Sequence, residues 1–324
     1  MSDKNSLINE NEDRYQALGQ NQETIMKGMK NKKLLTYWDY IQIDTLLGLQ
    51  KPRTHLPDEE IFILYHQVSE LYFKMILHEI KQIAHSKHLT AQLFYDRLKR
   101  INRYWDVLTL SYAVMRDGMD VNQYLQFRAS LIPASGLQSV QYRFIEIGCT
   151  ELSNLCDAKA LHKLPSKSRL KEYFKYIYWQ KAGVDSKTGQ KSLTLSIFEE
   201  KYLDELVQYA EEYRDKNLWL KYNHIPEVQK TKRLRKAMRE LDFKVNIAWP
   251  LVHYKVAEKY LESDDHTLEA TGGSDWKKYL HPKYQRRIFF PELWTSEERK
   301  NWGMSKDELV EHSNLEKNSI SHKV

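Results

Sequence analysis

Residues 58–83, DEEIFILYHQVSELYFKMILHEIKQI, form a long uninterrupted helical pattern around which the other segments can pack. Its apolar residues recur at the three- and four-residue spacing of a helix, in a stripe wide enough to face a core. Asp58 follows Pro57 and precedes two glutamates, which predicts that it caps the amino end of this helix. His66 lies within the stripe, and a lone histidine there is usually a hydrogen-bonded core residue.

The composition favours a large helical core. The chain has 324 residues, of which 41% are hydrophobic and 29% charged, and its 11 Gly and 8 Pro supply few turns for an all-β fold. The 50 basic and 44 acidic residues are interspersed. We therefore interpret the formal charge of +6 as a solvated surface and expect no nucleic-acid partner.

The sequence also indicates a cellular setting. We find no signal peptide and no apolar run that approaches the roughly 20 residues of a membrane span. The two cysteines, Cys149 and Cys156, share a helical pattern at a separation that suits neither a disulfide nor a zinc site. These features predict a soluble, cytoplasmic protein without a membrane partner.

Outward from residues 58–83, nearly every segment has helical periodicity. We expect helices over 34–50, 90–116, 121–131, from 137 onward, over 196–214 and over 231–262, the last interrupted near Pro250. No segment alternates as a strand does, so the predicted fold class is all-α. We expect a flexible tail over 1–20, one helical domain over 21–302 with a helical insertion at 158–230, and a polar tail over 303–324.

Three further features have both a structural and a functional interpretation. Arg128, one turn after Tyr124, suits either a helix end or a bidentate clamp for a carboxylate. His253, within WPLVHYKVAEKYL, suits either core packing or an axial bond to haem iron. The stretch ATGG, residues 270–273, is either an ordinary turn or a loop that brings the Thr271 hydroxyl to a ligand.

Several stretches together resemble the tryptophan 2,3-dioxygenase family. They are LTYWDYIQIDTLLGLQ, FILYHQVSELYFKMILHE, YLQFRASLIPASGLQSVQYRF, WPLVHYKVAEK and ATGGSDWKKYL, in the family's order and over much of residues 34–280. The patterns HQxxELxFK and FRxxLxPxSGxQSxQYR are specific. The chain departs from the family at Leu137, where Phe is usual, and at Ala270, where Gly is usual.

The resemblance implies an all-helical homotetramer with one haem b per subunit. It implies that O2 is inserted across the indole C2–C3 bond of L-tryptophan to give N-formyl-L-kynurenine, the first step of tryptophan catabolism by the kynurenine pathway. His253 would be the axial ligand of the iron, and Ser135 and Gly136 would contact the haem.

The resemblance also assigns the substrate site. His66 would be the catalytic histidine that accepts the indole N–H, and Arg128 would bind the substrate carboxylate. Thr271 would hold the ammonium group, and Phe62 and Tyr124 would line the pocket. A neighbouring subunit would close that pocket with residues of its first helix, namely Tyr37, Tyr40 and Ile41.

Two other functions compete with this interpretation. A haem monooxygenase or peroxygenase acting on a related aromatic amino acid would differ in the number of oxygen atoms transferred. A non-catalytic haem-based sensor is the other alternative. Arg128 argues against it, because a sensor of gas alone needs no clamp for a carboxylate.

Overall fold

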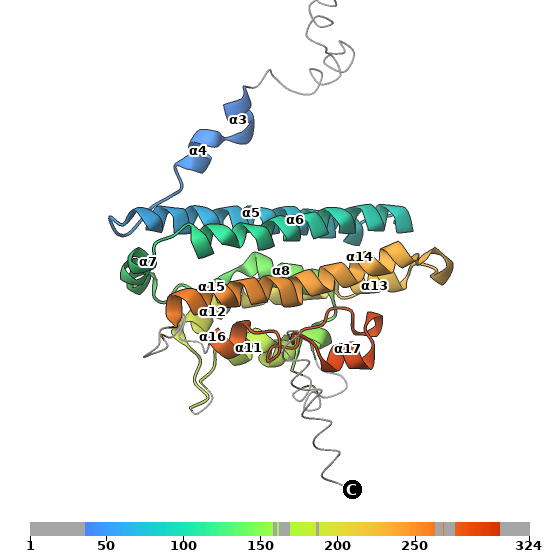
Figure 1. The fold of residues 1–324 in the computed structure, drawn as a ribbon. Helices are drawn as coiled ribbons and strands as arrows, with labels where there is room; N and C mark the ends of the chain where they lie inside the picture. Colours follow the sequence, from blue (N-terminus) through green and yellow to red (C-terminus); the bar gives the residue numbers. More distant parts are fainter. Residues whose placement is uncertain are drawn as a thin grey trace, which may run out of the picture. The chain divides into compact units, whose positions relative to one another are not determined.

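The computed structural model describes residues 36–157, 161, 169–185, 188–262, 268 and 276–304 (Figure 1). Over these ranges the regular structure is helical, and the β pairing between described residues consists of isolated bridges that join Cys156 with Ile177 and Val184 with Lys191. The all-α prediction is confirmed. Among the described helices, none combines the length and apolar character needed to cross a membrane.

The chain divides into two compact units after Lys51. In the first unit the structure describes two short helices, α3 (Tyr37–Ile41) and α4 (Ile43–Leu47), which bury no residue. Between them Gln42 has φ 52° and ψ 46°, in the left-handed region. The prediction of one continuous helix over 34–50 is therefore wrong, because a left-handed residue interrupts a right-handed helix.

The second unit opens with an antiparallel pair, α5 (Pro57–Ala84) and α6 (Ala91–Asp117), which run side by side (Figure 1). Leu56, not Asp58, is the N-cap of α5, and Pro57 takes the first helical position, where its missing N–H costs nothing. Thr90 caps α6 as predicted, since its Oγ1 accepts from Leu93 N at 3.1 Å.

A nearly continuous rod packs along α6 and carries His253 (Figure 1). It consists of α14 (Lys232–Phe243), a π-helical turn over Lys244–Ala248 (η6) and α15 (Trp249–Leu261). The interruption predicted near Pro250 is this π-helical turn. Proline has no N–H to donate back to the preceding turn, so a wider turn is accommodated there.

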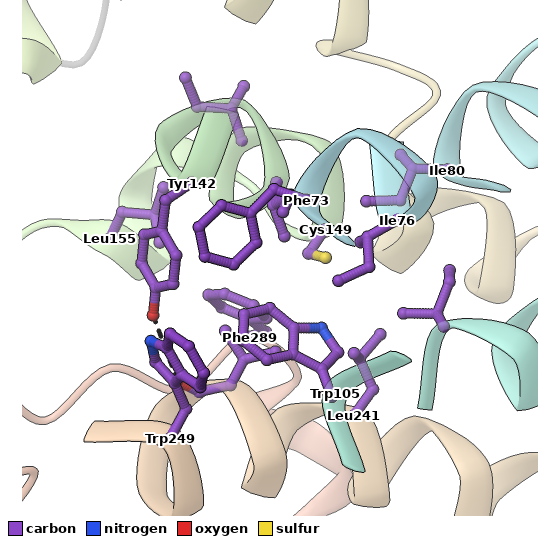
Figure 2. Close-up of a cluster of buried hydrophobic side chains, with 14 of the residues drawn as sticks. Phe73, Ile76, Ile80, Trp105, Tyr142, Cys149, Leu155, Leu241, Trp249 and Phe289 are labelled. Atoms are coloured by element: carbon purple, nitrogen blue, oxygen red, sulfur yellow. Dashed lines mark hydrogen bonds between the residues drawn. The ribbon is translucent and has the colours of Figure 1, made fainter. Parts of the chain in front are cut away.

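The core lies where α5, α6, α8 (Val140–Cys149) and the α14–α15 rod meet. Figure 2 shows its centre, where Phe73 of α5, Trp105 of α6 and Trp249 of α15 pack together. Tyr142 joins them, and its hydroxyl donates to Val245 O at 3.3 Å in the π-helical turn. This aromatic cluster therefore fixes the start of the helix that bears His253.

The remaining elements cover the core and its ends. They are α7 (Val121–Phe127), η1 (Arg128–Leu131), η2 (Gly136–Gln138), η3 (Leu152–Leu155), α10 (Leu170–Tyr173), η4 (Phe174–Tyr176), α11 (Tyr178–Ala182), α12 (Leu193–Tyr213), α13 (Leu218–Asn223), η5 (Glu227–Gln229), α16 (Trp276–Leu280), η7 (Pro291–Leu293) and α17 (Ser296–Lys300). Cys149 ends α8 and Cys156 lies beyond η3, so the prediction that the two cysteines share one helical segment is wrong.

Candidate functional site

The first turn of α5 holds the start of α7. Asp58 Oδ2 accepts from Asp120 N at 2.6 Å, and Asp58 N donates to Gln123 Oε1 at 3.2 Å. Asp120 in turn caps α7, since its Oδ1 accepts from Gln123 N at 2.9 Å. The residues of α7 are thereby fixed against those of α5, although their positions in the sequence are far apart.

An aromatic wall results from this junction. The Phe62 ring of α5 lies 6.0 Å from that of Tyr124 and 5.6 Å from that of Phe127, centroid to centroid. Tyr124 also packs at 4.6 Å against Tyr260 of α15. Three helices therefore supply rings to one wall, which suits a flat apolar ligand.

His66 stands one turn after Phe62 and contacts this wall. The two rings are 4.2 Å apart, and His66 Nδ1 lies 2.7 Å from Phe62 O. Because a carbonyl oxygen only accepts, Nδ1 carries the proton, and Nε2 of the neutral ring is left as an acceptor.

The protein around His66 keeps its ring neutral. Desolvation lowers the pKa of His66, against smaller opposing effects of the Phe62 hydrogen bond and the charge of Glu70. The His66 side chain is nevertheless accessible to solvent in this single subunit. Solvent access combined with desolvation is expected of a side chain that borders a protein-lined space.

Arg128 lies at the end of α7, beside Tyr124. Burial raises the pKa of the Tyr124 hydroxyl, while the charge of Arg128 and a hydrogen bond from it lower that pKa. The guanidinium is therefore next to the aromatic wall. A planar cation beside a flat apolar wall can bind a carboxylate attached to an aromatic group.

His253, on α15, borders the same region as His66. Burial, together with the charge that His66 carries when protonated, lowers the pKa of His253 to about 4. The Tyr112 ring of α6 lies 5.6 Å away at an interplanar angle of 26°. At neutral pH the His253 ring is uncharged and keeps a lone pair available for a metal.

The turn between η1 and α8 is held from both sides. Ser135 Oγ accepts from Leu137 N at 3.3 Å, and Gln138 Oε1 accepts from Ser135 N at 3.2 Å, which closes a capping box. Further along, Gln141 Nε2 donates to Glu70 O at 2.9 Å, one turn after His66. The capping box thus fixes the turn itself, and the Gln141 contact ties α8 to α5.

The residues present fit a haem group. An imidazole binds iron through a neutral ring nitrogen, and both His66 and His253 are held neutral by their surroundings. A Cβ placed on Gly136 would meet no heavy atom within 4 Å, so this turn borders open space. Across the described residues, no group of three or more His, Cys, Asp or Glu side chains could hold a bare metal ion.

The structure brings together Phe62, His66, Tyr124 and Arg128, and it places His253 within electrostatic reach of His66. Thr271 lies outside the described residues. Three other predicted site residues belong to the first unit and are described there alone, namely Tyr37, Tyr40 and Ile41.

Sequence reasoning missed three residues of this region. Phe127 packs against both Phe62 and Tyr124, and its position three residues after Tyr124 was an available signal. Tyr65 and Tyr112 lie beside the two histidines. Nothing in the helical pattern separates these two tyrosines from ordinary core residues.

Comparison with known proteins gives a consistent match. The family model described as "Tryptophan 2,3-dioxygenase" matches residues 21–245. This match includes Phe62, His66, Tyr124 and Arg128 and ends before His253.

Curated relatives extend the likeness over most of the chain. A tryptophan 2,3-dioxygenase of Bacillus thuringiensis subsp. konkukian (strain 97-27) is 29% identical over 298 residues, which is 85% of this chain and 97% of the relative. The enzyme of that name from Ruegeria sp. (strain TM1040) is 29% identical over 287 residues, or 81% and 91% of the two chains. One from Bradyrhizobium sp. (strain BTAi1 / ATCC BAA-1182) is 39% identical over 119 residues, 36% of this chain and 42% of the relative.

Proposed function

The chain belongs to the tryptophan 2,3-dioxygenase family, and on this premise we propose that it binds haem b and uses O2 to open the indole ring of L-tryptophan, giving N-formyl-L-kynurenine. One observation carries the proposal. A neutral His66 with a free acceptor nitrogen packs against an aromatic wall and lies within electrostatic reach of a second neutral imidazole, while Arg128 lies beside that wall.

The substrate's parts match these groups one by one. The indole ring would lie against Phe62 and Tyr124, and its N–H would donate to Nε2 of His66. Arg128 would bind the carboxylate, and Thr271 would bind the ammonium group. An indole N–H is a very weak acid, so we propose that His66 holds the substrate by this hydrogen bond and does not remove the proton.

His253 would bind the haem iron, and Ser135 and Gly136 would line the haem. The neutral state that burial gives His253 supports this assignment, as does the open space beside Gly136. When bound, the haem would supply the activation of O2, and the chain would supply binding, orientation and exclusion of water.

We also propose that the protein works as a cytoplasmic homotetramer. Large apolar side chains stay exposed on the outer sides of α5 and α6, at helical spacing: Leu64, Val68, Leu71 and Met75, with Val107, Leu110 and Val114. Exposed apolar residues at helical spacing of this kind suit burial against another copy. In that assembly Tyr37, Tyr40 and Ile41 would complete a neighbour's site.

The absorption spectrum of the purified protein tests the proposal. The protein as isolated, or supplied with haem, is expected to show a haem spectrum that changes when L-tryptophan is added. His253→Ala is expected to lose that spectrum or to bind haem weakly. A wild-type protein that binds no haem, or a His253→Ala variant with unchanged haem content and spectrum, would refute the assignment.

A further inference from the structure

The orientation of the His253 ring has no polar explanation in the described structure. Its two ring nitrogens form no hydrogen bond or ion pair with any described residue. Metal-bound histidines usually donate their second N–H to an acceptor that sets the plane of the ring. Within the described residues, the contacts that can orient this imidazole are therefore made by neighbouring rings.

Tyr112 of α6 provides that contact. Its ring is stacked on the His253 imidazole at 5.6 Å and 26°. Tyr112 is only 6% exposed and packs at 4.5 Å against Trp249, one turn before His253 on the same helix. Trp249 packs in turn on Trp105 at 5.5 Å. The Tyr112 ring therefore packs against the aromatic core, which restricts its movement.

The same tyrosine is linked to the other histidine. The Tyr65 ring lies 5.7 Å from Tyr112 and 5.7 Å from His66, to which it is nearly perpendicular at 88°. Ser111, the neighbour of Tyr112, donates to the Tyr65 hydroxyl at 3.5 Å. Tyr65 and Tyr112 thus form one packed pair between the two imidazoles.

We propose that Tyr112 is a positioning residue for His253: its ring, stacked on the imidazole, sets the plane in which that imidazole meets the iron. The inference rests on the proposed function, because it concerns the ligand that function assigns to haem. It predicts that an aromatic ring at position 112 matters and that the hydroxyl does not, since the contact is made by the ring face.

The test compares Tyr112→Phe and Tyr112→Leu in the full-length protein loaded with haem. Two readouts report on the iron ligand without turnover: the iron–imidazole stretching band in the resonance Raman spectrum of the ferrous protein, and the rate of haem transfer to an acceptor globin. Tyr112→Leu is expected to shift or broaden the band and to speed haem loss about tenfold or more. Tyr112→Phe is expected to match wild type in both.

Tyr104→Leu is the matched control, because Tyr104 is a half-buried tyrosine of the same helix whose ring pairs with Tyr72, at 6.5 Å. It should leave both readouts unchanged. If Tyr112→Leu does not fold, Tyr112→Met, which fills space without a ring, takes its place. The thermal midpoint is recorded for every variant.

Two results would overturn the positioning role. One is a non-aromatic variant at position 112 that keeps the wild-type band and haem-transfer rate; if its thermal midpoint falls at the same time, Tyr112 contributes packing alone. The other is a Tyr112→Phe variant that changes as much as Tyr112→Leu, which assigns the effect to the hydroxyl. Failure of wild type to bind haem, by contrast, refutes the proposed function itself.

Discussion

The imidazole of His253 lies within electrostatic reach of the imidazole of His66. Burial, and the positive charge of His66 when it is protonated, lower the pKa of His253 to about 4. Burial likewise lowers the pKa of His66. Both rings are therefore uncharged at neutral pH, although α5 and α15, which carry them, lie far apart in the sequence. An uncharged pair provides one lone pair for a metal and another for a hydrogen-bond donor.

The lowered pKa of His253 should be visible in how the stability of the haem-free protein depends on pH. A His253 pKa lowered from 6.5 to about 4 means that the unfolded state binds the proton more tightly. Neutral His253 therefore contributes to the free energy of unfolding in full above pH 6.5. This contribution, on the order of 3 kcal/mol, is lost as pH falls toward 4. Urea unfolding of His253→Ala should therefore show a shallower loss of stability than wild type over this range.

Asp242 acts in the opposite direction and provides the control. Burial raises the pKa of its carboxyl to about 6, so its contribution is full below pH 3.8 and is lost as pH rises through 6. Asp242→Asn should thus make the wild-type loss at low pH steeper. Parallel pH profiles for wild type and both variants would contradict the two assignments.

His66→Ala should lower the turnover of L-tryptophan without abolishing it. The histidine is proposed to accept the indole N–H, and a neutral hydrogen bond contributes about 0.5–1.5 kcal/mol. A 1-methyltryptophan substrate, which lacks that N–H, should be affected much less by the same substitution. Steady-state kinetics of both substrates measure the difference. Total loss of activity with intact haem and substrate binding would instead indicate obligatory base catalysis.

Arg128→Ala should weaken the use of L-tryptophan while haem content stays normal. Leaving the substrate carboxylate without its charged partner should lower kcat/KM, and the loss corresponds to about 2–5 kcal/mol of transition-state stabilisation. Arg128→Lys should recover only part of this, since lysine cannot form the bidentate contact. Tryptamine, which has no carboxylate, should be a poor substrate for wild type. Equal turnover of tryptamine and tryptophan by wild type would reject the clamp.

Glu146→Gln should destabilise the fold. Glu146 is fully buried and pairs with Arg143 and Arg287, each at 2.8 Å, and it accepts from Tyr178 at 2.6 Å. Removing this charge leaves two buried guanidinium groups uncompensated, at a cost of about 3–5 kcal/mol in the free energy of unfolding. Glu211→Gln, in an exposed pair with Arg214, should change it by less than about 1 kcal/mol. Similar effects of the two substitutions would be inconsistent with the cluster.

Much of the fold could be predicted from the helical spacing of apolar residues. α5, α6, α12 and the α14–α15 rod lie where that spacing placed them, and Thr90 caps α6 as expected. The break at Gln42 could not be predicted, because a left-handed residue leaves no mark on apolar periodicity. The prediction that Asp58 caps α5 was wrong: Asp58 lies in the first turn of α5, and its carboxylate accepts from Asp120 N, a tertiary contact that local sequence does not encode.

Some residues of the candidate site could likewise be predicted from the sequence, and others could not. Phe62, His66, Tyr124 and Arg128 could be named from motifs and resemblance, and the structure places them together. Tyr112 could not be found, because an aromatic residue on the core-facing side of α6 has the pattern of packing alone. Its relation to His253 exists only once α6 and α15 are packed.

The mass of the product formed from L-tryptophan under isotopically labelled O2 distinguishes a dioxygenase from the alternative functions. A tryptophan 2,3-dioxygenase places both atoms of one O2 molecule in the product, so we expect N-formyl-L-kynurenine carrying two labelled oxygens. Arg128→Ala, assayed in parallel, should form the same product more slowly. A product with one labelled oxygen would indicate a monooxygenase or peroxygenase, and no product from the haem-loaded protein would indicate a sensor; either result would contradict the proposed function.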